Sequence, residues 1–202
     1  MRIISLNVDG IQQAAARGLY EWLADQGADI ICVQDLRCLE YETDADIYHM
    51  DGYNAYFFDS GVKHYNGVAI YTRFLPKALI YGFGFSSGVD MEGRYLQVDF
   101  DNISIGSLFA PSATTNIESQ EVKMQFFDDL QAHLTKISRK RRDFIFCRNW
   151  GIAPKADDVS NPSTQQLASG FLPEEQHWMK QLSQVGYIDA FRHGNEDKDE
   201  YS

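Results

Sequence analysis

The feature that most constrains this chain is a succession of short apolar runs, each of which ends in polar or turn-forming residues. Residues 28–33 are apolar enough for a strand that is covered on both faces. In the stretch 143–154, the run DFIFC breaks into a polar turn and then meets a proline. Strands of this kind deliver loops to the rim of a sheet, where α/β proteins keep polar chemistry. The sequence therefore predicts an α/β fold.

The remaining elements follow from hydrophobic spacing and turn residues. A strand is predicted at 2–6, and a helix at 11–26 that ends at Gly27 and carries one apolar stripe: Ile11, Ala15, Leu19, Trp22 and Leu23. Residues 38–51 are acidic and irregular. A β-meander is predicted from five strand-like runs: 53–59, 67–73, 77–85, 94–100 and 103–110.

Two further helices are predicted after the meander. The first spans 118–139, with Val122, Phe126, Phe127, Leu130, Leu134 and Ile137 at helical spacing. The second begins at Pro173 and places three apolar residues on its inner face: Trp178, Leu182 and Val185.

Length and composition restrict the class of protein. A chain of 202 residues that is 44% hydrophobic predicts a single domain over 1–202. Its net charge of −11 works against general phosphate binding, so any nucleic-acid contact is expected to be local. The chain lacks an apolar run of ~18 to 20 residues and a signal peptide, which predicts a cytoplasmic protein without a membrane partner. The cysteines Cys32, Cys38 and Cys147 are expected to be buried thiols rather than metal ligands.

Oxygen donors follow three of the predicted strands, and the loops that carry them are expected at one rim. They are Asn7, Asp35 and Asn149. Hard oxygen ligands suit Mg²⁺, and a carboxylate beside the metal can deprotonate water. Asn and Asp at strand ends are, however, more often turn formers, so spacing alone leaves both interpretations open.

The phrases in this order resemble the exonuclease III branch of the endonuclease/exonuclease/phosphatase superfamily. The resemblance covers nearly the whole chain through SLNVDGI, ADIICVQD, HYNGVAIYTR, EGRY, DFIFC with NWGIAP, GFLPEEQHWM and GYIDAFRH. It implies a four-layer α/β sandwich and, for active members, Mg²⁺-dependent hydrolysis of phosphodiesters at abasic sites and DNA 3′ ends. The family's closing strands would lie beyond Ser202. We therefore expect this chain to be a fragment or a truncated gene product that lacks those strands and exposes a sheet edge.

The family's active positions differ here, and only Asn7 matches unchanged. Asp35 replaces a glutamate, which shortens the carboxylate's reach by ~1.5 Å. The loop Arg148-Asn149-Trp150-Gly151 replaces G-D-W-N, which removes the general base, and Phe109 replaces a tyrosine. Arg148 is expected beside the metal pocket, where its charge opposes Mg²⁺. No catalytic residue, no metal site and no cofactor is therefore expected.

Within this branch the chain resembles the nuclease-dead catabolite repression control members. The resemblance runs through the Q-D pair, the GRYLQ-DF phrase, the basic run before residue 143 and the GFL-PE phrase. It implies translational repression together with the RNA chaperone Hfq on A-rich mRNA. The alternatives are a Mg²⁺-dependent exodeoxyribonuclease III or abasic-site endonuclease that acts on DNA, and a nonfunctional remnant.

The run from Lys136 to Arg142 is the expected nucleic-acid contact, because it holds five basic residues in seven positions. Its expected binding residues, with Arg148, are Lys136, Arg139, Lys140, Arg141 and Arg142, and the patch can be extended by Lys77, Lys155 and Arg192. The alternative is a solvated end of a helix, where cations meet the helix dipole. All five histidines are expected to be structural or exposed: His49, His64, His133, His177 and His193. Core packing is favoured over base stacking for Tyr53, Tyr56, Phe57 and Phe58.

Overall fold

The computed structural model describes residues 1–113, 117–153 and 169–195. The chain divides into two compact units, each of which is described by itself. The first unit comprises Met1–Ala110 and Arg141–Trp150, and the second comprises Pro111–Lys140 and Gly151–Ser202. The prediction of one domain over 1–202 stays a prediction, and Lys155 lies outside the described residues.

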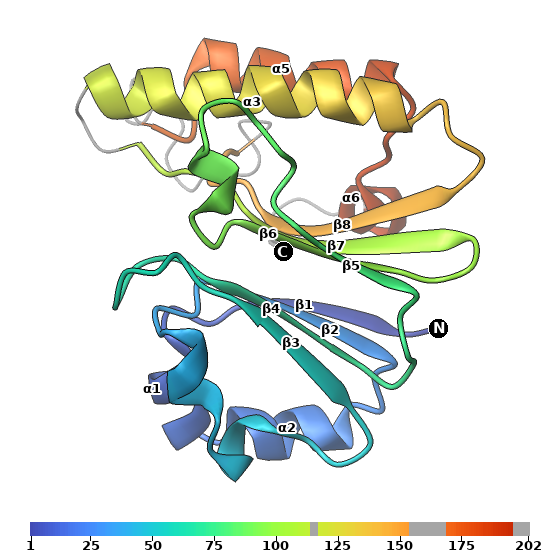
Figure 1. Cartoon of the computed structure of the whole chain (residues 1–202). Helices are drawn as coiled ribbons and strands as arrows, with labels where there is room; N and C mark the ends of the chain where they lie inside the picture. Colours follow the sequence, from blue (N-terminus) through green and yellow to red (C-terminus); the bar gives the residue numbers. More distant parts are fainter. Residues whose placement is uncertain (114–116, 154–168, 196–202) are drawn as a thin grey trace. The chain divides into compact units, whose positions relative to one another are not determined.

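The first unit contains two four-stranded sheets and two short helices (Figure 1). One sheet has the strand order β1-β2-β4-β3 and the other β5-β6-β7-β8. The strands are β1 Ile3–Asn7, β2 Ile30–Gln34, β3 Asn54–Phe58, β4 Val68–Thr72, β5 Ala78–Tyr81, β6 Tyr95–Asp99, β7 Ile103–Phe109 and β8 Asp143–Asn149. The helices of this unit are α1 Ile11–Ala16 and α2 Leu19–Asp25, with 3-10 turns at Glu40–Thr43, Asp46–Tyr48 and Val89–Met91. The predicted mixed α/β fold is confirmed.

The strand pairing places the expected site at one end of each sheet. Strands β1 and β2 are parallel, with Asn7 opposite Gln34, and β7 and β8 are parallel, with Phe109 opposite Asn149. The predicted single meander is wrong, because its five strands are divided between the sheets. Strands β3 and β4 pair in the first sheet, whereas β5, β6 and β7 form a smaller meander in the second.

Two hydrophobic cores hold the first unit together. One lies between the two sheets and is built from Ile30, Cys32, Val68, Ile70, Leu96, Val98, Ile105 and Cys147. The other lies between the first sheet and helices α1 and α2, which cover its outer face (Figure 1), and includes Ile11, Leu23, Ile31, Val33 and Tyr71. Strand β2 contributes to both cores and is buried at every residue, as its continuous apolar run predicts. The three cysteines are free and buried.

The helix predicted at 11–26 is broken. Gly18 has a left-handed backbone, with φ of 87°, so α1 ends before it and α2 begins after it. The break turns Tyr20 and Leu23 inward, whereas Trp22, expected on the inner stripe, is exposed. A glycine that adopts this conformation ends a helix at no steric cost, and hydrophobic spacing alone does not reveal that it will.

The second unit contains α3 Ile117–Ile137, α5 Pro173–Gln184 and the short α6 Ala190–Gly194. Helices α3 and α5 lie side by side (Figure 1), and the Trp178 indole Nε1 donates to the Phe127 carbonyl at 2.7 Å. The apolar stripe of α3 is confirmed except at Val122, which is exposed. Its neighbour Lys123 is buried instead, paired with Glu175 at 2.7 Å. No helix of the described residues has the length and apolar character that a membrane span requires.

Candidate functional site

Alternation along the strands turns the expected site residues toward the space between the two sheets. In β8, Ile145 and Cys147 pack in the inter-sheet core, so Asn149, two residues further on, faces the same way. Phe109 at the end of β7 also packs against this core, and Asn7 follows Ile3 on the inner face of β1. Since β1 contacts β8 and β2 contacts β7, the strand ends meet at one rim, as predicted.

A buried polar network fixes the two sheets to each other just below this rim. The Gln34 side-chain Nε2 donates to the Ser107 hydroxyl at 3.0 Å, and that hydroxyl donates to the Val33 carbonyl at 3.0 Å. The Ser5 hydroxyl donates to Gln34 Oε1 at 3.4 Å. Because Gln34 and Ser107 are buried, these bonds hold the ends of β2 and β7 at a fixed separation.

The carboxylate of Asp35 is held by an arginine two residues away. Arg37 donates from Nε to Asp35 Oδ1 at 3.1 Å and from Nη2 to Oδ2 at 2.9 Å, a bidentate pair. The same Nη2 lies 2.5 Å from Asp9 Oδ1. The hydrogen bond to Asp35 raises the pKa of Arg37 further above its usual value, so the guanidinium stays charged. We call Asp9, Asp35 and Arg37 the arginine clamp.

The backbone around the arginine clamp is unusual. Five non-glycine residues of the described chain have positive φ, and all lie in the loops of this rim: Asp9, Asp35, Arg37, His64 and Asn66. The loops bind one another, because Gly10 N–H donates to the Asp35 carbonyl at 2.9 Å and Arg37 N–H donates to the Asn66 carbonyl at 2.7 Å. Left-handed backbone at such residues is sparsely populated and clusters at functional sites. The clamp is therefore a built feature of the fold.

The residues at the rim do not fit a divalent cation. Both oxygens of Asp35 are engaged by Arg37, whose positive charge lies where a cation would approach. Asn149 is a neutral amide, and no three His, Cys, Asp or Glu side chains gather among the described residues. Mg²⁺ requires oxygen ligands in near-octahedral geometry. Asn7 contributes a neutral, exposed amide.

Arg148 does not occupy the place predicted for it. It alternates with Cys147 and Asn149 along β8 and therefore faces away from the other sheet. Its guanidinium lies over the Trp150 ring, 4.3 Å from the ring centroid. The cation that opposes a metal at this rim is Arg37, because strand alternation carries Arg148 to the opposite face of β8.

Gly151 belongs to the second unit and is positioned there by a buried ion pair. Its carbonyl accepts a hydrogen bond from Lys123 Nζ at 3.2 Å, and Lys123 pairs with Glu175. Glu175 also accepts from the N–H groups of Gly170 and Leu172, at 2.7 and 3.0 Å. The GFLPEE phrase thus holds the loop that follows β8, which gives this phrase a structural role.

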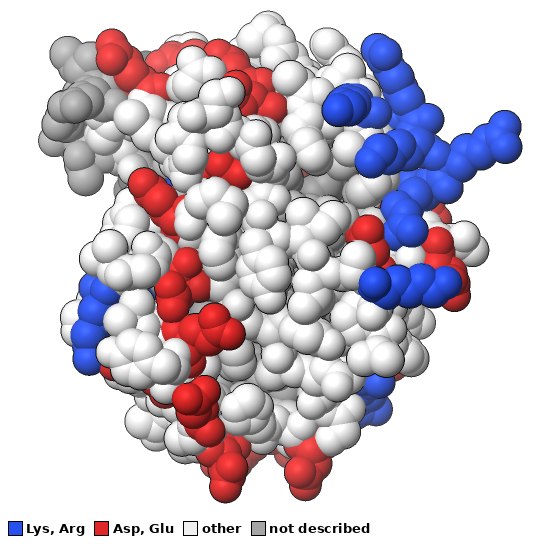
Figure 2. Space-filling view, viewed as in Figure 1, with Lys and Arg blue, Asp and Glu red and all other residues white. Residues whose placement is uncertain are grey.

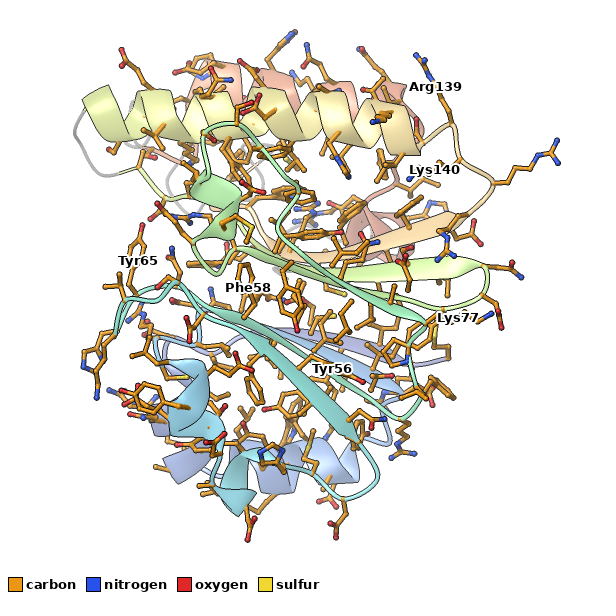
Figure 3. All side chains as sticks on the ribbon, viewed as in Figure 1. Tyr56, Phe58, Tyr65, Lys77, Arg139 and Lys140 are labelled. Atoms are coloured by element: carbon orange, nitrogen blue, oxygen red, sulfur yellow. The ribbon has the colours of Figure 1, made fainter. Side chains whose placement is uncertain are left out.

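The basic run divides into exposed and structural residues. Four of its side chains are exposed at the end of α3 and in the turn before β8: Lys136, Arg139, Lys140 and Arg141. Figure 2 shows basic side chains gathered at one side of the molecule, and Figure 3 labels Arg139 and Lys140. Arg142 is different, because its guanidinium donates to the carbonyls of Ile103 and Asp101 and to the Ser104 hydroxyl, at 3.1 to 3.2 Å. The prediction that Arg142 contacts RNA stays a prediction, and in this structure its donors bind the β6–β7 turn.

Other expected residues have local roles. Lys77 pairs with Asp101 on the turn that Arg142 binds, and Arg192 lies over the ring of Phe191.

The expectation for the histidines is confirmed, because His133 is half-buried and the other four are exposed, with His49 bonded to the Thr43 carbonyl. Core packing is confirmed for Phe57, which is buried, and also for Tyr53, Tyr56 and Phe58, which are partly buried and pack against the two cores.

The residues that sequence reasoning missed are Asp9 and Arg37. Asp9 stands in the loop SLNVDGI, and Arg37 stands two residues after Asp35. The sequence signal for this contact was an acidic and a basic residue in the loops of the predicted rim. The backbone is left-handed at Asp9, Asp35 and Arg37, and this conformation accompanies their contact. Residue spacing in the sequence does not predict it.

Comparison with known proteins places this site in a family. The profile of the Endonuclease/Exonuclease/phosphatase family matches residues 4–147. The chain belongs to this family. It is 26% identical over 194 residues to an exodeoxyribonuclease of Bacillus subtilis, covering 96% of this chain and 75% of that protein. It is 29% identical over 194 residues to the DNA repair nuclease APEX1 of Danio rerio, covering 95% of this chain and 62% of the relative, so the chain spans less than two thirds of that protein.

The solved structures show the same fold. An AP endonuclease of Archaeoglobus fulgidus superposes with a TM-score of 0.85 at 24% identity, covering 96% of this chain and 76% of that one. The 3′ phosphatase NExo of Neisseria, solved with a product DNA hairpin, gives a TM-score of 0.82 at 22% identity, covering 96% and 74%. These likenesses confirm the expected fold class.

Proposed function

We propose that this chain is an exonuclease III-type protein that binds nucleic acid without hydrolysing it. The observation that carries the proposal is the arginine clamp, in which Arg37 holds both oxygens of Asp35 and contacts Asp9. A guanidinium in a bidentate pair with a carboxylate neutralises the negative charge that would attract a cation. The Arg37 side chain thereby closes the rim to a metal ion.

The second support is the loss of a base at the end of β8. Asn149 has an amide, which does not accept a proton from water near neutral pH. Loss of a general base typically costs ~10²- to 10⁴-fold in rate. Together with the shorter Asp35 carboxylate and with Phe109 in place of a hydroxyl-bearing residue, this favours binding over hydrolysis.

Binding is assigned to the exposed part of the basic run, Lys136, Arg139, Lys140 and Arg141. On a chain with a net charge of −11 this local cluster suits a weak contact with a phosphate backbone, strengthened by a partner. The resemblance to the catabolite repression control members supports single-stranded, A-rich mRNA as the ligand and the RNA chaperone Hfq as the partner. In this role the protein represses translation.

A second candidate is a Mg²⁺-dependent exodeoxyribonuclease or abasic-site endonuclease of DNA repair. The comparisons favour it, because the relatives named above are an exodeoxyribonuclease and a DNA repair nuclease. The residues at the rim favour the first candidate. The two differ in one observable, which is whether bound nucleic acid is cut.

The test is a single assay of binding and cleavage at excess protein. A duplex with one abasic site and an A-rich single-stranded RNA are each incubated with Mg²⁺ or Mn²⁺. The native chain is compared with a variant that carries Asp35→Glu, Asn149→Asp and Gly151→Asn, and a cooperative melt establishes that both are folded. We expect retarded RNA and no new product from the native chain. Chelator-sensitive cleavage by the native chain would establish the second candidate.

A further inference from the structure

In the part of the chain that the structure describes, strand β5 is an edge of the second sheet. Among the described residues it pairs with β6 alone, with Ile80 opposite Gln97. Gly82 N–H donates to the Tyr95 carbonyl at 2.8 Å, in the same register as the strand. In an antiparallel ladder hydrogen-bonded and non-bonded pairs alternate, so the N–H and C=O groups of Leu79 and Tyr81 point away from β6. These groups form a row of donors and acceptors along the edge.

The side chains of this edge are apolar and accessible. Ile80 is 39% exposed and Tyr81 is 43% exposed, and the segment Ala78–Tyr81 contains neither a charge nor a proline. The Tyr81 ring packs edge-on against Phe58 of β3, with centroids 5.3 Å apart. Figure 3 shows Tyr56 and Phe58 beside this edge, in the neighbouring sheet. An uncharged edge of this kind is a template for another strand.

Opposite charges mark the two ends of the edge. Lys77 precedes β5, is exposed, and pairs with Asp101 of its own chain. At the other end, Asp59 follows Phe58, and one oxygen of Asp59 accepts the N–H of Glu40 at 2.6 Å. The pKa of Tyr81 is raised by burial and next by the charge of Glu40. Figure 2 shows uncharged surface across the middle of this face and charged side chains at its sides.

We propose that β5 pairs antiparallel with β5 of a second copy of this chain. A two-fold axis through Ile80 brings Leu79 opposite Tyr81 of the partner subunit, so the four outward-facing N–H and C=O groups of each strand pair across it. The same axis brings Lys77 next to Glu40 of the partner subunit. The edge is therefore self-complementary in hydrogen bonding and in charge, which selects a second copy as its occupant.

The pairing is short. Pro76 cannot donate a backbone hydrogen bond, and Gly82 already donates to β6, so the paired segment is limited to the four residues of β5. Short strands limit edge pairing, and small interfaces give weak, transient complexes. The dimer is expected to form in a concentration-dependent manner.

The first test measures the sedimentation of the full chain over a series of concentrations. The native chain shifts from monomer to dimer, and Ile80→Lys weakens the dimer at least about tenfold, because like charges then face each other across the axis. Lys77→Glu and Glu40→Lys each weaken it, and the combined variant recovers it, because the exchanged charges match again. A chain that stays monomeric at every concentration, or a dimer that Ile80→Lys leaves unchanged, overturns the proposal.

The second test is a cross-link that depends on the register. Ile80→Cys places two thiols about 4.5 Å apart at their Cα atoms across the axis, within disulfide range. Mild oxidation then gives a covalent dimer. The matched control Ala78→Cys lies two residues from the axis and gives none, because the two copies of residue 78 are too far apart. Equal cross-linking of both variants contradicts the register and overturns the proposal.

Discussion

Two buried carboxylates of this chain, Glu175 and Asp35, are held by basic side chains that differ in how far water reaches them. In the second unit Glu175 and Lys123 are both fully buried, at 0% and 1% exposure. At the rim of the first unit the Asp35 side chain is buried, whereas that of Arg37 is 45% exposed. The buried pair positions a helix and a loop, whereas the arginine clamp lies at the surface and occupies oxygens that a ligand could use. Burial thus distinguishes the Lys123–Glu175 pair, which stabilises the fold, from the Arg37–Asp35 pair, which occupies oxygens at the surface.

The largest expected effect is on the buried pair. Lys123→Met leaves Glu175 charged and without its ammonium partner, which is expected to lower the free energy of unfolding by about 3 to 5 kcal/mol. Glu175→Gln is expected to do the same from the other side. Denaturant unfolding measures both. The double variant Lys123→Met with Glu175→Leu removes both charges, so it should lose less than either single change. A loss under about 1 kcal/mol for both single variants would remove the contrast with the clamp.

A smaller effect is expected at Arg142, which extends the comparison to the basic run. Arg142→Ala removes the hydrogen bonds to the Ile103 and Asp101 carbonyls and to the Ser104 hydroxyl, and is expected to cost about 1 to 3 kcal/mol of stability. Arg141→Ala, at an exposed position, should leave stability within about 0.5 kcal/mol. It should instead reduce the slope of nucleic-acid affinity against salt by about one. If Arg142→Ala changed only the salt slope, Arg142 would belong with the binding residues.

The arginine clamp should be weak as a source of stability. Arg37→Met is expected to cost at most about 1 kcal/mol, because an ion pair with a half-exposed guanidinium is screened by water. Lys63→Met, which breaks the exposed pair with Glu42, is the matched control and should behave alike. Thermal unfolding of both variants measures the difference. A loss as large as that of Lys123→Met would mean that the clamp is structural.

The smallest effect concerns His133, which is half-buried on α3. Burial, and then the charges of Lys140 and Lys136, lowers its pKa from the ordinary value. The unfolded chain therefore binds this proton at higher pH than the folded chain. The contribution of neutral His133 to the free energy of unfolding is present above about pH 6.5 and is lost as pH falls through the folded-state pKa. His133→Gln should flatten the fall in stability between pH 7 and 5, and His193→Gln, at an exposed site, should not.

Sequence patterns predicted the parts of this fold that depend on continuous apolar runs. Strand β2 is an example, because every residue of it is buried. They failed where a single backbone conformation ends an element. The left-handed backbone at Gly18 divides the helix that hydrophobic spacing predicts as continuous. They also failed where a polar residue takes an apolar place, as Lys123 does beside exposed Val122.

The candidate site was predicted in its location and not in its chemistry. Asn7, Phe109 and Asn149 reach the rim because strand ends and alternation place them there. Arg37 was missed because its contact with Asp35 requires left-handed backbone at both residues. Arg148 was misplaced because one residue of offset along β8 changes the face. Positions set by periodicity are readable from sequence, whereas contacts set by loop conformation are not.

The most direct test of the closed rim is the binding of Mn²⁺, followed by the resonance signal of the free ion. We expect no saturable site at the rim of the native chain, and at least about tenfold tighter binding by Arg37→Met, because this change removes the charge that holds Asp9 and Asp35. Lys63→Met, which frees a carboxylate elsewhere, controls for charge alone and should bind like the native chain. Tight binding of one Mn²⁺ by the native chain, abolished by Asp35→Asn, would contradict the closed rim and favour the nuclease.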